Sequence, residues 1–243
     1  MALITGASRG IGAATAKLLA RNGAAVAVNY CNAEAAGREV VRDIEQHGGK
    51  AMIVRADVRV QAEVEEMVRA VEESLGPIDT LVLNANIGFP VAPFMDYSWD
   101  AFAAKLTGEL AAAFHCCKAV LPGMISRKNG CIIAVSSGLS RNPMTGFCAH
   151  STAKSGLDAF VKSLASELGP YGVRVNAIAP GLTLTDATDG TPPEIKQYIC
   201  GATPLRRIGR PEDIAGAILM VASDKSGFIS GNYFPVDGGK TML

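Results

Sequence analysis

The sequence contains no long apolar run. Across its 243 residues no hydrophobic stretch approaches the ~20 residues of a membrane-spanning helix, so no membrane anchor is predicted. The opening segment, Met1–Gly6, is too short, and too soon interrupted by glycine, to be a secretory signal peptide. We therefore expect a soluble, cytoplasmic protein.

An excess of charge of either sign is also missing. Lys and Arg number 23, and Asp and Glu also number 23, so the sequence gives no reason to expect nucleic acid or an anionic membrane as a partner. The six cysteines and three histidines show no metal-ligand spacing. The sequence therefore predicts no metal site, and it favours reduced, mostly buried thiols.

Apolar residues, in contrast, are abundant. They make up 49% of the chain, which is enough to bury both faces of a sheet. Short apolar or β-branched segments alternate with longer amphipathic ones, a pattern typical of a parallel sheet with helices on both faces. The seven predicted strands are Ala2–Thr5, Ala25–Asn29, Ala51–Arg55, Thr80–Leu83, Cys131–Ser136, Arg174–Ala179 and Tyr233–Val236. We expect one doubly wound α/β domain of the Rossmann type over residues 1–243.

The amphipathic stretches predict helices. They cover Gly12–Arg21, Ala33–His47, Val60–Leu75, Trp99–Arg127 with a break, and His150–Leu168. One long segment, Gly181–Gly201, shows no clear element and contains Thr191-Pro192-Pro193. Long loops in compact domains usually serve as lids or binding loops, so we expect a lid over a substrate, with a disordered crossover as the alternative.

Three glycines follow the first predicted strand. Gly6, Gly10 and Gly12 lie between that strand and the first helix. Glycine lets the backbone turn sharply and approach a diphosphate, whose charge is met by free N–H groups and by the positive end of the helix dipole. With a strand before it and a helix after it, this loop predicts a dinucleotide site.

The spacing of these glycines resembles a known cofactor motif. Thr5–Gly12 is similar to the glycine loop of the short-chain dehydrogenases/reductases, and the resemblance extends along the whole chain. Within this family the sequence is most similar to the 3-oxoacyl-ACP reductases. The further matching segments are Ala56-Asp57-Val58, Asn176–Gly181 with Thr185, Arg207–Ala215 and Val236–Gly239.

The resemblance implies a nicotinamide dinucleotide as cofactor. The residues that it assigns to cofactor binding are Gly6, Ser8, Arg9, Gly10, Ile11, Gly12, Tyr30, Asp57, Val58, Asn84, Ala85, Lys154, Pro180, Gly181 and Thr185. An NAD enzyme tends to place a carboxylate at the end of the second strand, but here that strand ends Asn29-Tyr30-Cys31. Arg9 has the chemistry to pair with a 2′-phosphate, so we favour NADP(H) over NAD(H); a solvated loop cation is the alternative for Arg9.

The family's carbonyl chemistry, as the resemblance implies it, uses Asn, Ser, Tyr and Lys. Ser137 and Lys154 match two of these positions, but His150 stands where the family has Tyr, and Glu109 where it has Asn. The resemblance assigns Ser137 to the carbonyl oxygen and Lys154 to the nicotinamide ribose.

His150 and Lys154 lie four residues apart and therefore on one helix face. Imidazole is a competent acid near neutral pH, although the Lys154 cation would lower its pKa and the Glu109 carboxylate would raise it. We therefore hypothesise a rewired Glu109–His150 acid pair. The alternatives are a site that binds cofactor without catalysis, and non-redox chemistry such as dehydration or isomerisation.

The first functional interpretation is an NADP(H)-dependent reductase of a carbonyl substrate, either a small molecule or an acyl chain on a carrier protein. The second is a catalytically silent, cofactor-binding subunit that partners or regulates an active reductase. By resemblance, we expect a homotetramer formed through Trp99–Arg127, His150–Leu168 and Phe228–Gly239.

Overall fold

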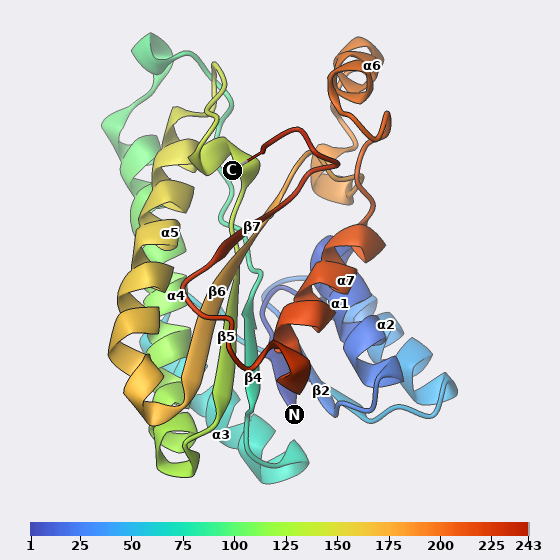
Figure 1. Cartoon of the computed structure of the whole chain (residues 1–243), viewed down its shortest axis with the longest axis vertical. Coiled ribbons are helices and arrows are strands. Elements are labelled where there is room, and N and C mark those ends of the chain that lie inside the picture. The colour runs from blue at the N-terminus through green and yellow to red at the C-terminus, as the bar shows by residue number, and fades with distance from the viewer. Residues whose placement is uncertain (243) are drawn as a thin grey trace.

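Seven parallel strands form one sheet at the centre of the computed structural model, which describes residues 1–242 (Figure 1). The strands are β1 (Ala2–Ile4), β2 (Val26–Tyr30), β3 (Ala51–Arg55), β4 (Thr80–Leu83), β5 (Gly130–Val135), β6 (Val173–Pro180) and β7 (Tyr233–Val236). Their order across the sheet is β3-β2-β1-β4-β5-β6-β7, and every neighbouring pair is parallel. The predicted Rossmann-type fold and its seven strands are confirmed.

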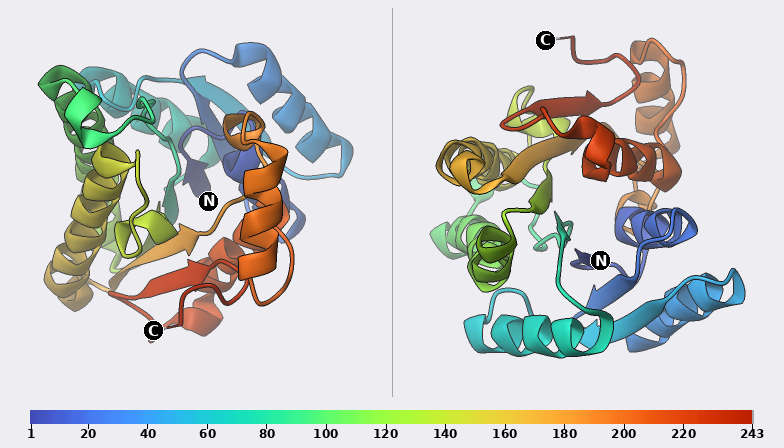
Figure 2. Two further views of the ribbon diagram at one scale, coloured as in Figure 1. Left: turned by 90° about the horizontal axis from the view of Figure 1, so that it is seen from above. Right: turned by 60° about the horizontal axis from the view of Figure 1, so that its bottom comes forward.

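Helices cover both faces of the sheet (Figure 2). One face carries α1 (Gly10–Arg21), α2 (Glu34–Gln46) and α7 (Pro211–Ala222), and the other carries α3 (Gln61–Leu75), α4 (Trp99–Arg127) and α5 (Cys148–Leu168). Among the described residues, no helix combines the length and the apolar character that crossing a membrane requires.

The strands are apolar because both of their faces are covered. Every residue of β1, β2 and β5 is buried. Leu3 and Ala27 belong to the apolar cluster under α3, α4 and α5, whereas Ile4 and Val28 belong to the cluster under α1, α2 and α7. Since successive side chains of a strand point to opposite faces, a doubly covered strand is apolar at every position.

The centre of the sheet contains the point where the chain reverses its direction of winding. β2 lies on one side of β1 and β4 on the other, so the helices that follow β1 and β4 pack on opposite faces of the sheet. Ligands of open α/β sheets bind at such a point, outside the carboxyl ends of the strands. Figure 1 places α6 (Pro193–Ala202) beyond this same edge of the sheet.

Helix α4 differs from its prediction. The sequence predicts a break within Trp99–Arg127, but α4 runs unbroken through Pro122. Proline removes one helical hydrogen bond. Burial of one side of the helix, including Ala112, Cys116 and Val120, outweighs that loss. The predicted break is therefore wrong.

The segment 181–201 also differs from its prediction. Instead of lacking a clear element, it contains the short helix Asp186–Thr188 and most of α6. Pro193 opens α6, because proline at the first helical position has its φ preset and needs no N–H partner. The prolines that indicated a loop thus mark the start of a helix, while the lid role of this segment stays a prediction.

Gly12 sets how closely α1 approaches the glycine loop. A Cβ at this position would lie 2.5 Å from Asn84 Nδ2 and 2.7 Å from Gly6 O. We expect Gly12→Ala to lower the free energy of unfolding by about 1–3 kcal/mol, because backbone atoms must shift. Urea unfolding measures the change.

The matched control is Gly216→Ala in α7. A Cβ there would meet no atom within 4 Å. We expect this substitution to raise the free energy of unfolding by about 0.5–1 kcal/mol, because alanine is the better helix former. Equal effects of the two substitutions would contradict the close-packing explanation of Gly12.

Candidate functional site

The glycine loop forms a cradle at the start of α1. Gly6 and Gly10 have φ of +59° and +55°, a region that glycine adopts without strain. Within the described chain, α1 has no side-chain cap and no acidic residue in its first turn. Its leading N–H groups and its dipole can therefore meet an anion, and the cradle fits the diphosphate of a dinucleotide.

The turn after β4 is bonded to this loop. Asn84 Nδ2 donates to the carbonyl oxygens of Thr5 and Gly6 at 2.9 and 3.0 Å. The N–H groups of Asn84 and Ala85 donate to Thr5 Oγ1 at 2.9 and 3.0 Å. The structure thus brings the predicted cofactor residues Asn84 and Ala85 against the glycine loop.

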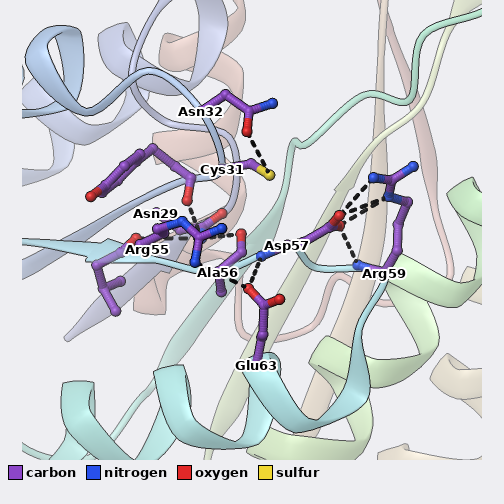
Figure 3. A network of polar contacts seen from close by, with 10 residues as sticks. Asn29, Cys31, Asn32, Arg55, Ala56, Asp57, Arg59 and Glu63 are labelled. Carbon is purple, nitrogen blue, oxygen red and sulfur yellow. Dashed lines mark hydrogen bonds and ion pairs between the residues drawn. The ribbon is translucent and has the colours of Figure 1, made fainter.

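Asn29, in β2, has a structural role that the sequence analysis missed. Its side chain is buried, accepts a hydrogen bond from the Gly6 N–H at 3.0 Å and donates one to Ala56 O at 3.1 Å. Asn29 therefore connects the glycine loop to the turn after β3, and Figure 3 shows Asn29 beside Ala56 of that turn. The available sequence signal was an amide side chain in an otherwise apolar strand.

The turn after β3 carries the predicted residues Asp57 and Val58. Figure 3 shows Arg59 folded back onto Asp57, with Nη2 at 2.6 Å from Oδ2 and Nε at 2.9 Å from Oδ1. Hydrogen bonding by Arg59 lowers the pKa of Asp57. The Asp57 N–H donates to Glu63 Oε2 at 2.9 Å. The chain's own side chains therefore fix this turn.

Arg9 lies on the surface of the glycine loop, close to the segment that follows β6. Its Nη1 atom lies 3.7 Å from Asp186 Oδ2, and both side chains are more than half exposed. A Cβ at Gly10 would lie 3.3 Å from the Thr185 methyl group. The predicted residues Pro180 and Gly181 end β6 and begin this segment. Two distant parts of the predicted cofactor site are thus adjacent.

A buried charge cluster lies between α4 and α5. Lys154 Nζ donates to Glu109 Oε1 at 2.6 Å and to Val135 O at 2.7 Å. Lys105 Nζ donates to the other carboxylate oxygen, Oε2, at 2.6 Å. Lys105, Glu109 and Lys154 are each at most 4% exposed. One carboxylate therefore compensates two ammonium groups.

Lys105 is a site residue that the sequence analysis missed. Its other hydrogen bonds join Nζ to Asn86 Oδ1 at 2.8 Å and to Ile87 O at 2.9 Å. A lysine four residues before Glu109 was the available signal, because such pairs share a helix face. On an exposed helix the same spacing forms a solvated ion pair, and the sequence does not distinguish the two cases.

The two ammonium groups determine the charge of Glu109. Burial alone would raise the pKa of this carboxyl, but Lys154 and Lys105 together lower it to about 2. Burial lowers the pKa of Lys105 to about 8, with a smaller contribution from Lys154. Glu109 is therefore a carboxylate at neutral pH, held by lysines.

His150 occupies a different environment from the one predicted. Its ring stacks on Phe89 with centroids 4.7 Å apart, and its buried Nδ1 has no hydrogen-bond partner among the described residues. Burial, Lys154 and Lys105 lower the pKa of His150 to about 3, although Glu109 opposes them.

The expected Glu109–His150 acid pair is therefore not formed. Both oxygens of Glu109 accept from ammonium groups instead, because two cations outcompete one imidazole for a single buried carboxylate. The role of His150 in the reaction stays a prediction, but the ring is neutral at physiological pH.

Ser137 lies directly after β5, where its neighbours are fixed. Its Oγ accepts from the Leu139 N–H at 3.2 Å. The buried Asp158 accepts from Ser136 Oγ at 2.5 Å and from Ser140 Oγ at 2.6 Å, so one carboxylate holds both ends of the Ser137 turn. The sequence analysis missed Asp158, which follows Lys154 by one turn of α5.

The predicted catalytic residues thus come from three elements. Ser137 follows β5, Glu109 lies on α4, and His150 and Lys154 lie in the first two turns of α5. Lys154 connects these three elements, because it lies on α5 and its Nζ contacts both Glu109 on α4 and Val135, the last residue of β5. Among residues 1–242 no cluster of His, Cys, Asp and Glu has the arrangement of a metal site.

Comparison with known proteins extends over nearly the whole chain. The family model described as "Enoyl-(Acyl carrier protein) reductase" matches residues 6–241. The 3-oxoacyl-[acyl-carrier-protein] reductase of Synechocystis sp. is 40% identical, over 100% of this chain and 97% of that protein. The reductase of the same name from Staphylococcus aureus is 35% identical, over 99% and 98%.

A solved structure agrees with these relatives. It is a 7 alpha-hydroxysteroid dehydrogenase complexed with NADH and 7-oxo glycochenodeoxycholic acid. It superposes with a TM-score of 0.93 at 36% sequence identity, and the match covers 98% of this chain and 92% of the dehydrogenase chain.

Because His150 is neutral in the folded chain, we predict that the free energy of unfolding depends on pH. Its pKa is about 3 in the folded chain against an ordinary value of 6.5, so between these values only the unfolded chain binds a proton there. The free energy of unfolding should therefore fall as the pH drops below about 6.5, by up to ~1.4 kcal/mol per pH unit. Urea unfolding between pH 7 and pH 5 measures this slope.

Two variants distinguish the contribution of His150 to this slope from that of other titratable groups. His150→Phe keeps an aromatic ring against Phe89 and should flatten the slope. His47→Phe, at an exposed position, should leave the slope as it is. A steep slope that persists in His150→Phe would rule out His150 as its source.

Proposed function

The chain belongs to the short-chain dehydrogenase/reductase family, a family of oxidoreductases, and from this membership we propose that it uses NADP(H) to reduce a carbonyl group. A 3-oxoacyl chain on a carrier protein is the preferred substrate class, supported by the names of the Synechocystis and Staphylococcus relatives. The observation that carries the proposal is the buried Lys154 ammonium, held between Glu109 and the end of β5 beside Ser137.

Lys154 keeps one donor for the cofactor. An ammonium group has three N–H donors. Two of them are used, toward Glu109 Oε1 and Val135 O. The third is assigned to a hydroxyl of the nicotinamide ribose. The bound cofactor would supply the hydride, while the residues of the chain orient and polarise the carbonyl.

Ser137 and His150 are assigned to the carbonyl oxygen. Ser137 Oγ donates one hydrogen bond. The unpartnered, buried Nδ1 of His150 favours the tautomer that carries its proton on Nε2, because a buried N–H without an acceptor costs more than a buried lone pair. His150 then acts as a neutral donor through Nε2–H, as neutral imidazoles do at other carbonyl sites. Water supplies the proton that completes the alcohol.

The preference for NADP(H) rests on the charges around β2 and the glycine loop. Asn29 is engaged within the fold, and no carboxylate follows it directly at the end of β2. The next carboxylate, Glu34, is bound by Arg38 with Nη2 at 2.6 Å from Oε1. Arg9 is exposed and weakly paired. A 2′-phosphate therefore meets a cation here, and a ribose 2′-OH meets no free carboxylate.

A second candidate function follows from the same imidazole. A residue that is neutral and lacks a partner for Nδ1 is a poor substitute for a phenol acid. The chain would then bind NADP(H) without turnover, as a silent or regulatory subunit of an active reductase. The glycine cradle and the Lys154 cluster support cofactor binding in both cases.

Three further assignments accompany the proposal. The segment 181–201 acts as a substrate lid, supported by its place beyond the carboxyl ends of the strands (Figure 1). The chain forms a homotetramer through α4, α5 and the Phe228–Gly239 segment, in which Phe228 is fully exposed. The protein works in the cytoplasm.

Turnover of a panel of 3-oxoacyl thioesters with NADPH tests the reaction. We expect Ser137→Ala and His150→Ala each to lower kcat by about 10²-fold, the usual loss when one donor to a reacting oxygen is removed. His150→Tyr should raise kcat, because it restores the phenol acid that the resembling family uses.

The control for these variants is His47→Ala, at an exposed position far along the chain from α5. Unchanged turnover in His150→Ala would end the assignment of His150. A wild-type chain that binds NADPH in a fluorescence titration but reduces no substrate would favour the silent subunit.

Cofactor choice is tested by Arg9→Ala. We expect the Kd for NADPH to rise by about tenfold or more, because hydrogen bonds between a guanidinium and a phosphate are lost, while the Kd for NADH stays the same. Isothermal titration with each cofactor gives both constants. An equal loss for both cofactors would show that Arg9 does not read the 2′ position.

A further inference from the structure

Lys105 is a fully buried cation whose hydrogen-bonding capacity is filled by the chain itself. Its three N–H donors point to Asn86 Oδ1, Ile87 O and Glu109 Oε2, at 2.8, 2.9 and 2.6 Å. The side chain is 0% exposed. Lys105 therefore has no donor left for a substrate or a cofactor, and any effect on the reaction passes through the groups that it holds.

The first of these groups is the Glu109 carboxylate. Lys105 binds Oε2 and Lys154 binds Oε1, so each ammonium takes one oxygen. Without Lys105, both oxygens of Glu109 are free to turn toward Lys154 and take a second of its N–H donors. Lys105 thus prevents a bidentate pair that would withdraw the Lys154 donor assigned to the ribose.

The second group is the loop after β4. Lys105 binds its backbone at Ile87 and also lies 5.1 Å from the ring centroid of Phe89. Phe89 stacks on His150 at 4.7 Å. The Lys105 ammonium therefore contacts both Phe89, on which the His150 ring stacks, and Glu109, which binds Lys154. In this way it connects the surroundings of His150 to those of Lys154.

We infer that Lys105 is a positioning residue of the cofactor site, which fixes Glu109 so that the third N–H of Lys154 faces the nicotinamide ribose. The inference rests on the proposed function, because it takes NADP(H) as the ligand. It also explains why Lys105 occurs together with Glu109: without this carboxylate, the Lys105 ammonium would be a buried charge without compensation.

The test compares two probes of the same site. NADPH reaches Lys154, whereas 2′,5′-ADP carries the adenosine and phosphate groups but no nicotinamide ribose. We expect Lys105→Met to raise the Kd for NADPH by about tenfold, the equivalent of one hydrogen bond from a charged donor, and to leave the Kd for 2′,5′-ADP unchanged. Lys118→Met, the same change at an exposed position of α4, should affect neither constant.

A rescue variant separates positioning from general damage. Lys105→Met with Glu109→Asn removes both charges of the pair, and we expect it to bring the NADPH Kd back close to the wild-type value. Glu109→Asn alone leaves two buried ammonium groups without a carboxylate and should bind NADPH most weakly. The double variant should therefore bind NADPH more tightly than Glu109→Asn alone. This comparison tests the inference even if Lys105→Met alone does not fold.

The outcomes are distinct. An unchanged ratio of the two Kd values in Lys105→Met overturns the inference and leaves the proposed function intact. The same holds if the double variant binds NADPH as weakly as Lys105→Met, because Glu109 would then not transmit the effect. A wild-type chain that binds neither probe overturns the proposed function, and this inference with it.

Discussion

The candidate site depends on one buried carboxylate that is shared by two ammonium groups. Glu109 is 4% exposed, and its oxygens contact Lys105 and Lys154 at 2.6 Å each. In a low-dielectric interior, a cation without a partner is far more costly than one within a pair. The positions of the Lys154 and Lys105 ammonium groups follow from how this single negative charge is shared, and through Lys105 the carboxylate is connected to the loop after β4.

The scaffold could be predicted from the sequence because its signals are local. Strands covered on both faces are apolar at every position, and the glycine loop lies between a strand and a helix. The predictions failed in two segments that contain proline. Pro122 lies inside α4 and Pro193 begins α6, and only packing or position within the helix distinguishes these prolines from breakers.

The site was less predictable than the scaffold, because it depends on which charges meet in space. The sequence predicted Glu109, His150 and Lys154 as site residues, but it paired Glu109 with His150, whereas the carboxylate is bound by Lys105 and Lys154. Nothing in the sequence distinguishes a buried lysine at 105 from a solvated one. Asp158 was missed for the same reason: its partners Ser136 and Ser140 come from a different element, 22 and 18 residues earlier in the chain.

The reversal of winding at β1 and β4 divides the site into two parts built from different stretches of chain. The diphosphate cradle and the adenosine side come from residues before about position 60, whereas Lys105, Glu109, Ser137, His150 and Lys154 come from α4, α5 and the end of β5. Substitutions in the later part therefore leave the contacts to the diphosphate and the adenosine in place, and they change only the contact to the nicotinamide ribose and the reacting groups. The reacting groups of this architecture can therefore be exchanged while the diphosphate and the adenosine keep their binding site, so that reaction chemistry and adenosine recognition are separable within one domain.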